Sequence, residues 1–136
     1  MGAANVEVCV GDARTAAEPR SYDRVLVDPP CSGLGTLQSR PDIRWRASRD
    51  KIAALAALQS EILLAGAAAT APGGTLVYSV CTISRAEGDH VVDGLLDERA
   101  DFICDQRRQL LPHCDGTDGF FIARLQRTRA PISDVS

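Results

Sequence analysis

The sequence predicts an α/β fold with a mostly parallel sheet, helices on its faces and an antiparallel C-terminal edge. Short apolar runs alternate with two helical segments, as in sheets whose strands are covered on both faces. The last two apolar runs have no helix between them, so we expect them to pair antiparallel. The chain has 136 residues, of which 45% are hydrophobic, and this is enough for one domain with a modest core.

Two short strands are predicted near the N-terminus. The first, Val6–Val10, ends at Gly11-Asp12. The second, Arg24–Val27, is apolar and ends in Asp28-Pro29-Pro30, because two consecutive prolines cannot continue a hydrogen-bonded ladder. Each predicted strand is therefore followed within two residues by an aspartate.

A long loop and a long helix follow. The loop, residues 31–49, is rich in Gly, Ser, Pro and Arg, and it is long enough to be functional rather than a simple connection. We expect Asp50 to cap a helix that runs to about Ala71. The segment Pro72-Gly73-Gly74 should end this helix.

The C-terminal half contains three predicted strands and one helix. Thr75–Val80 is an apolar strand that ends at Cys81. Ser84 and Glu87 have the spacing of a capping box for a helix to about Glu98. We expect a short strand at Phe102–Cys104 and a further strand at Phe120–Gln126. Residues 1–126 should form one unit, and Arg127–Ser136 should be a flexible tail.

Composition argues against several classes of protein. No stretch reaches the ~18 uninterrupted apolar residues of a membrane helix, and no basic-then-apolar leader follows Met1, so we expect a cytoplasmic location. The net charge of −3 argues against a protein that simply coats nucleic acid. The five cysteines form no C-x-x-C pair, and neither histidine has partners at metal spacing. We therefore expect reduced thiols and no metal site.

One local basic cluster stands out against this acidic background. Four arginines fall within ten residues, with Trp45 among them: Arg40, Arg44, Arg46 and Arg49. Such a patch on an acidic domain can bind phosphates. The alternative interpretation, a solvated loop without a ligand, remains open at this point.

Reactive side chains follow three of the predicted strands. Asp12 follows the first strand, Asp28 and Cys31 the second, and Cys81 the third. Ligands of open α/β sheets bind beyond the carboxyl ends of the strands, so these groups should meet in one crevice. A lone buried cysteine usually only packs, which is the role we expect for Cys9, Cys104 and Cys114. Both aspartates could also be simple turn residues.

The chain resembles the Fmu/Sun-type (RsmB-like) RNA cytosine-C5 methyltransferases. The resemblance extends from about Val8 to Leu125 and rests on segments in the family's order: DRVLVDPPCSGLGTLQSRPDIRWR, LQSEIL, GGTLVYSVCTISRAEGDHVV and DGFFIARL. A lone D-P-P would be weak, whereas D-P-P-C together with Y-S-x-C-[ST] is specific. The resemblance implies part of a Rossmann-like methyltransferase sheet.

The resemblance also implies roles for individual residues. Cys81 would add to carbon-6 of cytosine, carbon-5 would take a methyl group from S-adenosylmethionine, and Cys31 would assist release of the product. Asp28 would hold the cytosine edge and border the cofactor, and Asp12 would lie near the cofactor's adenine. The substrate would be RNA, in particular rRNA, near the loop residues Arg40, Arg44 and Trp45.

The chain departs from the family pattern in several places. Val80 replaces the usual threonine before the nucleophile, and the family's E-E-N-like segment appears as Ala86-Glu87-Gly88. The A-P-G-G-K-like loop and the ribose-binding acid are missing, together with the first two strands. We therefore expect an incomplete cofactor site and an inactive fragment. Its unpaired edge at Arg24–Val27 should pair with a second copy, as a homodimer, or with a rearranged Val6–Val10.

Two other functions are compatible with parts of this pattern. Amino-methyltransferases of DNA or RNA also contain D-P-P, but an aromatic residue follows it there, and Cys31 and Cys81 argue against this class. A non-catalytic RNA-binding or interaction remnant remains possible because the cofactor loop is missing.

Overall fold

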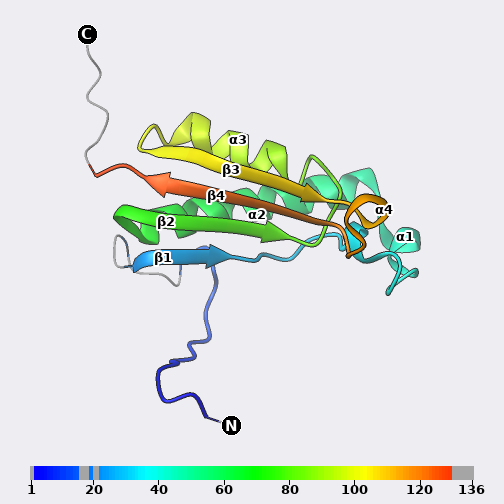
Figure 1. Ribbon diagram of the computed structural model, residues 1–136, viewed down its shortest axis with the longest axis horizontal. Helices are drawn as coiled ribbons and strands as arrows, with labels where there is room; N and C mark the ends of the chain where they lie inside the picture. Colours follow the sequence, from blue (N-terminus) through cyan, green and yellow to red (C-terminus); the bar gives the residue numbers. More distant parts are fainter. Residues whose placement is uncertain (1, 16–18, 20–21, 130–136) are drawn as a thin grey trace.

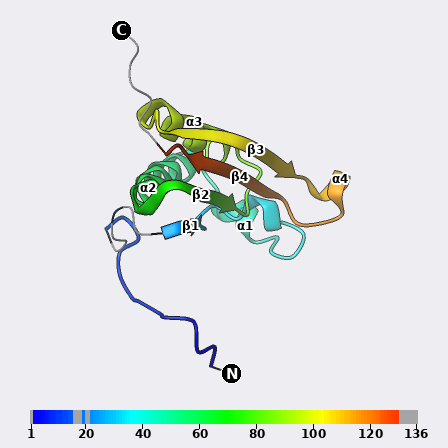
Figure 2. The same ribbon diagram turned by 60° about the vertical axis from the view of Figure 1, so that its left-hand side comes forward.

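Four strands form a single sheet in the computed structural model, which describes residues 2–15, 19 and 22–129. The strand order is β1-β2-β4-β3 (Figure 1). The strands are β1 (Tyr22–Val27), β2 (Thr70–Val80), β3 (Phe102–Leu110) and β4 (Phe120–Arg127). The two longer helices, α2 (Arg49–Ala69) and α3 (Asp89–Glu98), contact each other and lie on the same face of the sheet (Figures 1 and 2).

The pairing of the strands confirms the partial Rossmann-like sheet with an antiparallel C-terminal edge. β1 and β2 are parallel, with α2 as the crossover between them. β2 pairs antiparallel with β4, and β4 pairs antiparallel with β3. Only one of these pairs is parallel, so the described sheet is mixed rather than mostly parallel.

The predicted strand at Val6–Val10 is wrong. This segment joins no ladder, and its valines are exposed, with Val8 at 84% and Val10 at 103%. β-branched residues favour strands only where a neighbouring strand and a packed face are available. β1 is an edge strand, as expected, because β2 is its single neighbour in the described sheet. The rearrangement of Val6–Val10 onto that edge does not occur.

Helix α2 begins two residues earlier than predicted, with a different cap. Ser48 is the N-cap, and its hydroxyl accepts a hydrogen bond from the backbone N–H of Lys51 at 3.3 Å, while Asp50 lies in the first turn. By length and composition α2 could cross a membrane. One such helix is weak evidence of a membrane span, and α2 packs on the sheet. Ala67 and Leu63 of this helix are fully buried.

The core lies between α2, α3 and the covered face of the sheet. Tyr78 and Phe121 meet edge to face, with ring centroids 6.3 Å apart. Helix α2 lies close to β1, because a Cβ at Gly66 would come within 2.6 Å of Val27. The other fully or almost fully buried side chains are those of Leu63, Leu76, Val80, Val91, Val92, Leu95, Ala123 and Leu125.

The C-terminal elements differ from the prediction in three ways. Gly88 rather than Ser84 is the N-cap of α3, so the capping box is wrong. β3 extends to Leu110 because backbone pairing with β4 continues through its polar residues. Arg127, assigned to a tail, is 8% exposed and ends β4, while residues 130–136 of that tail lie outside the described residues.

Three short elements were not predicted: η1 (Leu34–Thr36), α1 (Ile43–Arg46) and α4 (Pro112–Asp115).

Candidate active site at the ends of β1 and β2

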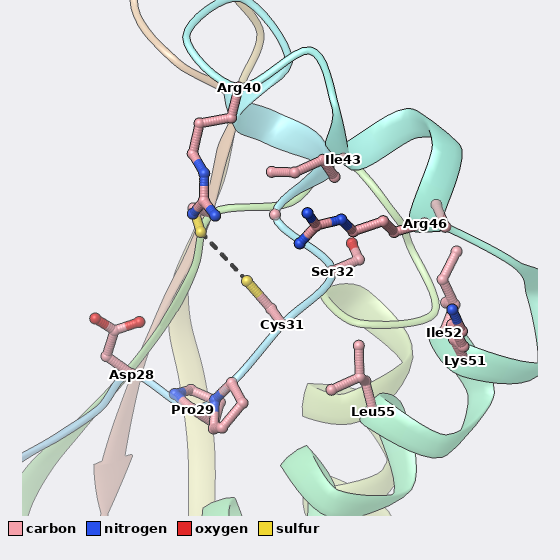
Figure 3. Close-up of a pocket in the computed structure, with 14 residues that line it drawn as sticks. Asp28, Pro29, Cys31, Ser32, Arg40, Ile43, Arg46, Lys51, Ile52 and Leu55 are labelled. Atoms are coloured by element: carbon pink, nitrogen blue, oxygen red, sulfur yellow. Dashed lines mark hydrogen bonds between the residues drawn. The ribbon is translucent and has the colours of Figure 1, made fainter.

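The two motif cysteines are in contact. β1 leads through Asp28-Pro29-Pro30 to Cys31, and β2 leads directly to Cys81. Because β1 and β2 are parallel neighbours, their carboxyl ends lie side by side. The Sγ atoms of Cys31 and Cys81 are 3.3 Å apart (Figure 3). The predicted convergence of these two motifs is therefore confirmed.

A pocket of about 580 Å³ opens beside the two cysteines. Its wall carries one carboxylate and three cationic side chains, together with apolar side chains from α1 and α2 (Figure 3). Such a mixture suits a ligand that has a flat polar ring and a phosphate. The charged and thiol side chains of the lining are those of Asp28, Cys31, Cys81, Arg40, Arg46 and Lys51.

The environment of Cys31 differs from that of an exposed thiol. Burial, and then its hydrogen bond with Cys81, raises the pKa of Cys31 to about 12. Cys31 therefore keeps its proton at neutral pH and can donate it toward the Cys81 sulfur. A protonated thiol is a weak nucleophile, so this environment suits an acid better than an attacking group.

The loop after Cys31 is fixed against the other strand ends by backbone contacts. The N–H of Gly35 donates to the carbonyl of Cys81 at 3.1 Å, and the N–H of Gly119 donates to the carbonyl of Gly35 at 2.7 Å. A Cβ at Gly35 would overlap the carbonyl of Gly119. Only glycine allows this approach, which ties together the loops after β1 and β2 and the entry to β4.

Asp28 lies where two pockets meet. It lines the cysteine pocket and also a second pocket of about 500 Å³ along the exposed edge of β1. Asp12, the other carboxylate expected near the cofactor, lines neither pocket. Its carboxylate pairs with Arg14 at 2.7 Å, and hydrogen bonds from Arg14 lower the pKa of Asp12 to about 2. Asp28 is thus the carboxylate that the two pockets share, whereas Asp12 lies outside both.

The basic cluster divides into two groups. Arg40 lines the cysteine pocket, whereas Arg44 stacks on Trp45 at 4.7 Å outside it. Trp45 is 79% exposed, so its ring is available to a ligand on the surface beside α1. Arg46 of the basic cluster also lines the pocket, and so does Lys51, which no sequence pattern indicated.

Glu87 is the other residue that the sequence analysis missed. Its side chain is fully buried directly beneath the two cysteine loops, where it bonds to Ser32 and Thr82. The capping-box interpretation concealed it, although its place in the family's E-E-N-like segment was a usable signal. Within the described part of the chain, no three His, Cys, Asp or Glu side chains are grouped to hold a metal ion.

Comparison with known proteins identifies relatives along most of the chain. The family model described as 16S rRNA methyltransferase RsmB/F matches residues 1–126. The chain is 40% identical to the probable ribosomal RNA small subunit methyltransferase B of Bacillus subtilis, over 85% of this chain and 30% of that protein. It is 42% identical to the ribosomal RNA small subunit methyltransferase B of Pectobacterium atrosepticum, over 89% of this chain and 30% of that protein.

Solved structures agree with this relationship. The crystal structure of PH0851 superposes with a TM-score of 0.84 at 32% identity, over 88% of this chain and 30% of that one. NSun6 from Pyrococcus horikoshii, solved with SFG, gives 0.80 at 27% identity, over 93% and 36%. The chain spans about a third of the length of these relatives. The chain belongs to the RsmB/F family of 16S rRNA methyltransferases.

Proposed function

We propose that the full-length protein methylates carbon-5 of a cytosine in rRNA through a covalent adduct between that cytosine and Cys81. One observation carries the proposal: Cys31 and Cys81 touch at 3.3 Å inside a pocket that Asp28 and Arg40 also line. The printed names of the relatives, which are ribosomal RNA small subunit methyltransferases, support rRNA as the substrate class.

The chemistry requires a thiolate because carbon-5 of cytosine is a poor nucleophile. The Cys81 thiolate forms a bond to carbon-6, and the electrons of the 5,6 double bond move to carbon-5. S-adenosylmethionine, when bound, supplies the methyl group that carbon-5 accepts. A base then removes the carbon-5 proton, the double bond re-forms, and the bond from carbon-6 to sulfur breaks. The sulfur of Cys81 is thereby released and can take up a proton as it leaves.

The surroundings of Cys81 support distinct roles for its neighbours. Cys31 holds a proton 3.3 Å from the Cys81 sulfur and can deliver it as that sulfur leaves, which assists product release. The Asp28 carboxylate is exposed at the pocket, where it can accept hydrogen bonds from the cytosine edge. Arg40, together with Arg46 and Lys51, supplies positive charge for the phosphates of the bound nucleotide.

Asp28 is also the residue that we assign to the cofactor side. It is shared between the cysteine pocket and the pocket along β1, so one carboxylate can contact both substrates. The similar structure of NSun6 was solved with SFG, a ligand of the S-adenosylmethionine type, which supports this cofactor. The assignments of Asp12 to the adenine, and of Arg44 and Trp45 to RNA, stay predictions.

Trapping on modified RNA tests the proposal in the full-length protein. A fluorine at carbon-5 cannot leave as a proton, so RNA that contains 5-fluorocytosine should hold the wild-type enzyme as a covalent adduct. Cys81→Ala should form no adduct and transfer no methyl group, whereas Cys31→Ala should still form the adduct. Cys114→Ala is the matched control, since this exposed cysteine on α4 lies outside the pocket. An adduct that survives in Cys81→Ala but not in Cys31→Ala would reverse the two roles.

Location and assembly follow from the same proposal. Modification of rRNA is consistent with the expected cytoplasmic location. A homodimer through the exposed edge of β1 stays a prediction. Light scattering over a concentration series checks it, and a constant monomer mass would contradict it.

A further inference from the structure

We propose that Glu87 is a positioning residue that holds Cys31 and Cys81 at reacting distance by bonding to the residue that follows each of them. The catalytic consequence rests on the proposed function, whereas the geometric role does not. Glu87 lies in the loop between β2 and α3, and its side chain is fully buried.

Both oxygens of the carboxylate are fully used. Oε1 accepts hydrogen bonds from the backbone N–H of Ser32 at 2.8 Å and from the side-chain amide of Gln59 at 3.1 Å. Oε2 accepts from the hydroxyl of Ser32 at 2.6 Å and from the hydroxyl of Thr82 at 3.0 Å. A carboxylate has about four acceptor sites, so these four donors saturate it.

The positions of the donors show what the carboxylate holds. Ser32 directly follows Cys31, and Thr82 directly follows Cys81, so one side chain bonds to both cysteine loops across 50 residues of sequence. The Gln59 amide also donates to the carbonyl of Pro30 at 2.9 Å, which fixes the residue before Cys31. The loops on which the two sulfurs stand are therefore joined through Glu87.

The direction of each hydrogen bond is determined by the donors available. The Thr82 hydroxyl oxygen accepts from the N–H of Ser84 at 3.1 Å, and the Ser32 hydroxyl oxygen accepts from the N–H of Leu34 at 3.4 Å. Each hydroxyl has a single proton, and it uses this proton to donate a hydrogen bond to the carboxylate, which can only accept. Charge-assisted bonds of this kind are stronger than neutral ones, and this suits a joint that must hold two loops in register.

The backbone of Glu87 is anchored separately from its side chain. The buried hydroxyl of Tyr78 donates to the Glu87 carbonyl at 2.7 Å. No ion pair to Glu87 forms among residues 2–15, 19 and 22–129, so its charge is stabilised by neutral donors alone. Removing the side chain should thus release the two loops while the main chain after β2 stays in place.

An isosteric amide separates the positioning role from a role of the charge. In Glu87→Gln, the amide oxygen can still accept from Ser32 and Gln59. Its NH₂ group can donate to the Ser32 and Thr82 hydroxyl oxygens, which lie 3.1 Å apart, so that one hydroxyl can donate to the other while the proton of the second loses its acceptor. Glu87→Gln should therefore keep most of this connection, whereas Glu87→Ala should leave the two loops held by the backbone bond from Gly35 to Cys81 and the Ser32–Thr82 contact alone, with a wider range of spacings between the sulfurs.

The spacing of the thiols can be measured without any methylation assay. In a glutathione redox buffer the two thiols and one glutathione disulfide give the Cys31–Cys81 disulfide and two reduced glutathiones. The equilibrium constant, followed by mass spectrometry of the linked peptides in the full-length protein, rises with the effective concentration of one thiol near the other. We expect Glu87→Ala to lower it about tenfold or more, and Glu87→Gln to lower it less than about threefold.

Controls distinguish positioning from a general loss of stability. Thr70→Val removes another buried hydroxyl, which bonds to Gly66 at the end of α2, and it should lower Tm while leaving the redox equilibrium unchanged. If Glu87→Ala does not fold, Thr82→Val and Ser32→Ala remove one donor each and should give smaller losses in the same direction. An equilibrium constant within threefold of wild type in Glu87→Ala would overturn the proposal, as would unchanged constants in both Thr82→Val and Ser32→Ala if Glu87→Ala does not fold.

The rate of adduct formation on 5-fluorocytosine RNA provides the second readout. It should fall in Glu87→Ala and recover in Glu87→Gln. Equal loss in both variants would mean that the negative charge acts in the reaction, and it would overturn a purely positioning role. A wild-type protein that forms no adduct would refute the proposed function, whereas the redox measurement would still decide the role of Glu87.

Discussion

Two pockets meet at Asp28, and they differ in how completely the chain builds them. On the cysteine side, loops from β1, β2 and β4 are joined by Glu87 and by the backbone bonds of Gly35. On the β1 side, the exposed edge faces a segment, Val6–Val10, that forms no ladder. The difference indicates that the pocket of the two cysteines is preassembled within this chain, whereas the pocket along β1 is less completely built.

The largest effect should come from Cys31, because it would interrupt turnover after the methyl group has been transferred. In the full-length protein, Cys31→Ala should accumulate a stable protein–RNA conjugate on ordinary cytosine RNA, since no thiol proton then assists the departure of Cys81. Denaturing gel electrophoresis detects the conjugate, and Cys114→Ala provides the control. Normal turnover without any conjugate would reduce Cys31 to a structural residue of the loop after Pro30.

The affinity for the cofactor should show how completely this chain builds the pocket along β1. The 136-residue chain should bind S-adenosylmethionine at least about 100-fold more weakly than the full-length protein, because several hydrogen bonds of about 1 kcal/mol each are missing. Isothermal titration calorimetry of both proteins measures the ratio. Tight, stoichiometric binding by the 136-residue chain would show that the β1 side is complete after all.

The backbone contact at Gly35 should be sensitive to a single methyl group. Gly35→Ala places a Cβ against the Gly119 carbonyl and should lower the free energy of unfolding by about 3 kcal/mol. Gly94→Ala is the matched control, because nothing lies within 4 Å of a Cβ at this exposed helical position. There the helix propensity of alanine should raise stability by about 0.5–1 kcal/mol. Urea unfolding that ranks the two variants in the opposite order would contradict the contact.

The far end of the sheet should provide the smallest effect, and one that depends on pH. Hydrogen bonds from Arg99 lower the pKa of Asp101 to about 2, and Arg127 pairs with it at 2.8 Å. Because the folded pKa lies below the usual value, Asp101 stabilises the fold above about pH 4 and loses this contribution as the pH falls toward 2. Asp101→Asn should cost about 2 kcal/mol at pH 7 and progressively less between pH 4 and 2.

Asp105→Asn is the control for that titration. Asp105 pairs with the half-exposed Arg124, so this substitution should change stability much less. If the difference in the free energy of unfolding between wild type and Asp101→Asn stays constant from pH 7 down to pH 2, the role of Asp101 is contradicted.

The sequence predicted those elements whose apolar pattern matches their surroundings. β1, β4 and the two long helices are apolar where they face the core, so periodicity locates them. β3 was predicted too short because Asp105–Gln109 is exposed and polar, and only pairing with β4 makes it a strand. Val6–Val10 has the composition of a strand but no partner, and no local pattern contains that information.

The candidate site was predictable for a similar reason, and only in part. Strand ends brought Cys31 and Cys81 together, because the order of elements alone places parallel neighbours side by side. The role of Glu87 depends on donors from Ser32, Gln59 and Thr82, which are distant in sequence or turned by the loop. A local rule, three residues from a serine to a glutamate, therefore gave the wrong partner.

The parallel pairing of β1 and β2 has a consequence for how the chain folds. Parallel neighbours require a crossover, here α2, so Cys31 cannot reach Cys81 through any local turn. During synthesis Cys31 emerges 50 residues before its partner, and the lasting contact between the two thiols depends on docking of α2 and pairing of β1 with β2. Rapid cross-linking of these two sulfurs would therefore report that both events have taken place.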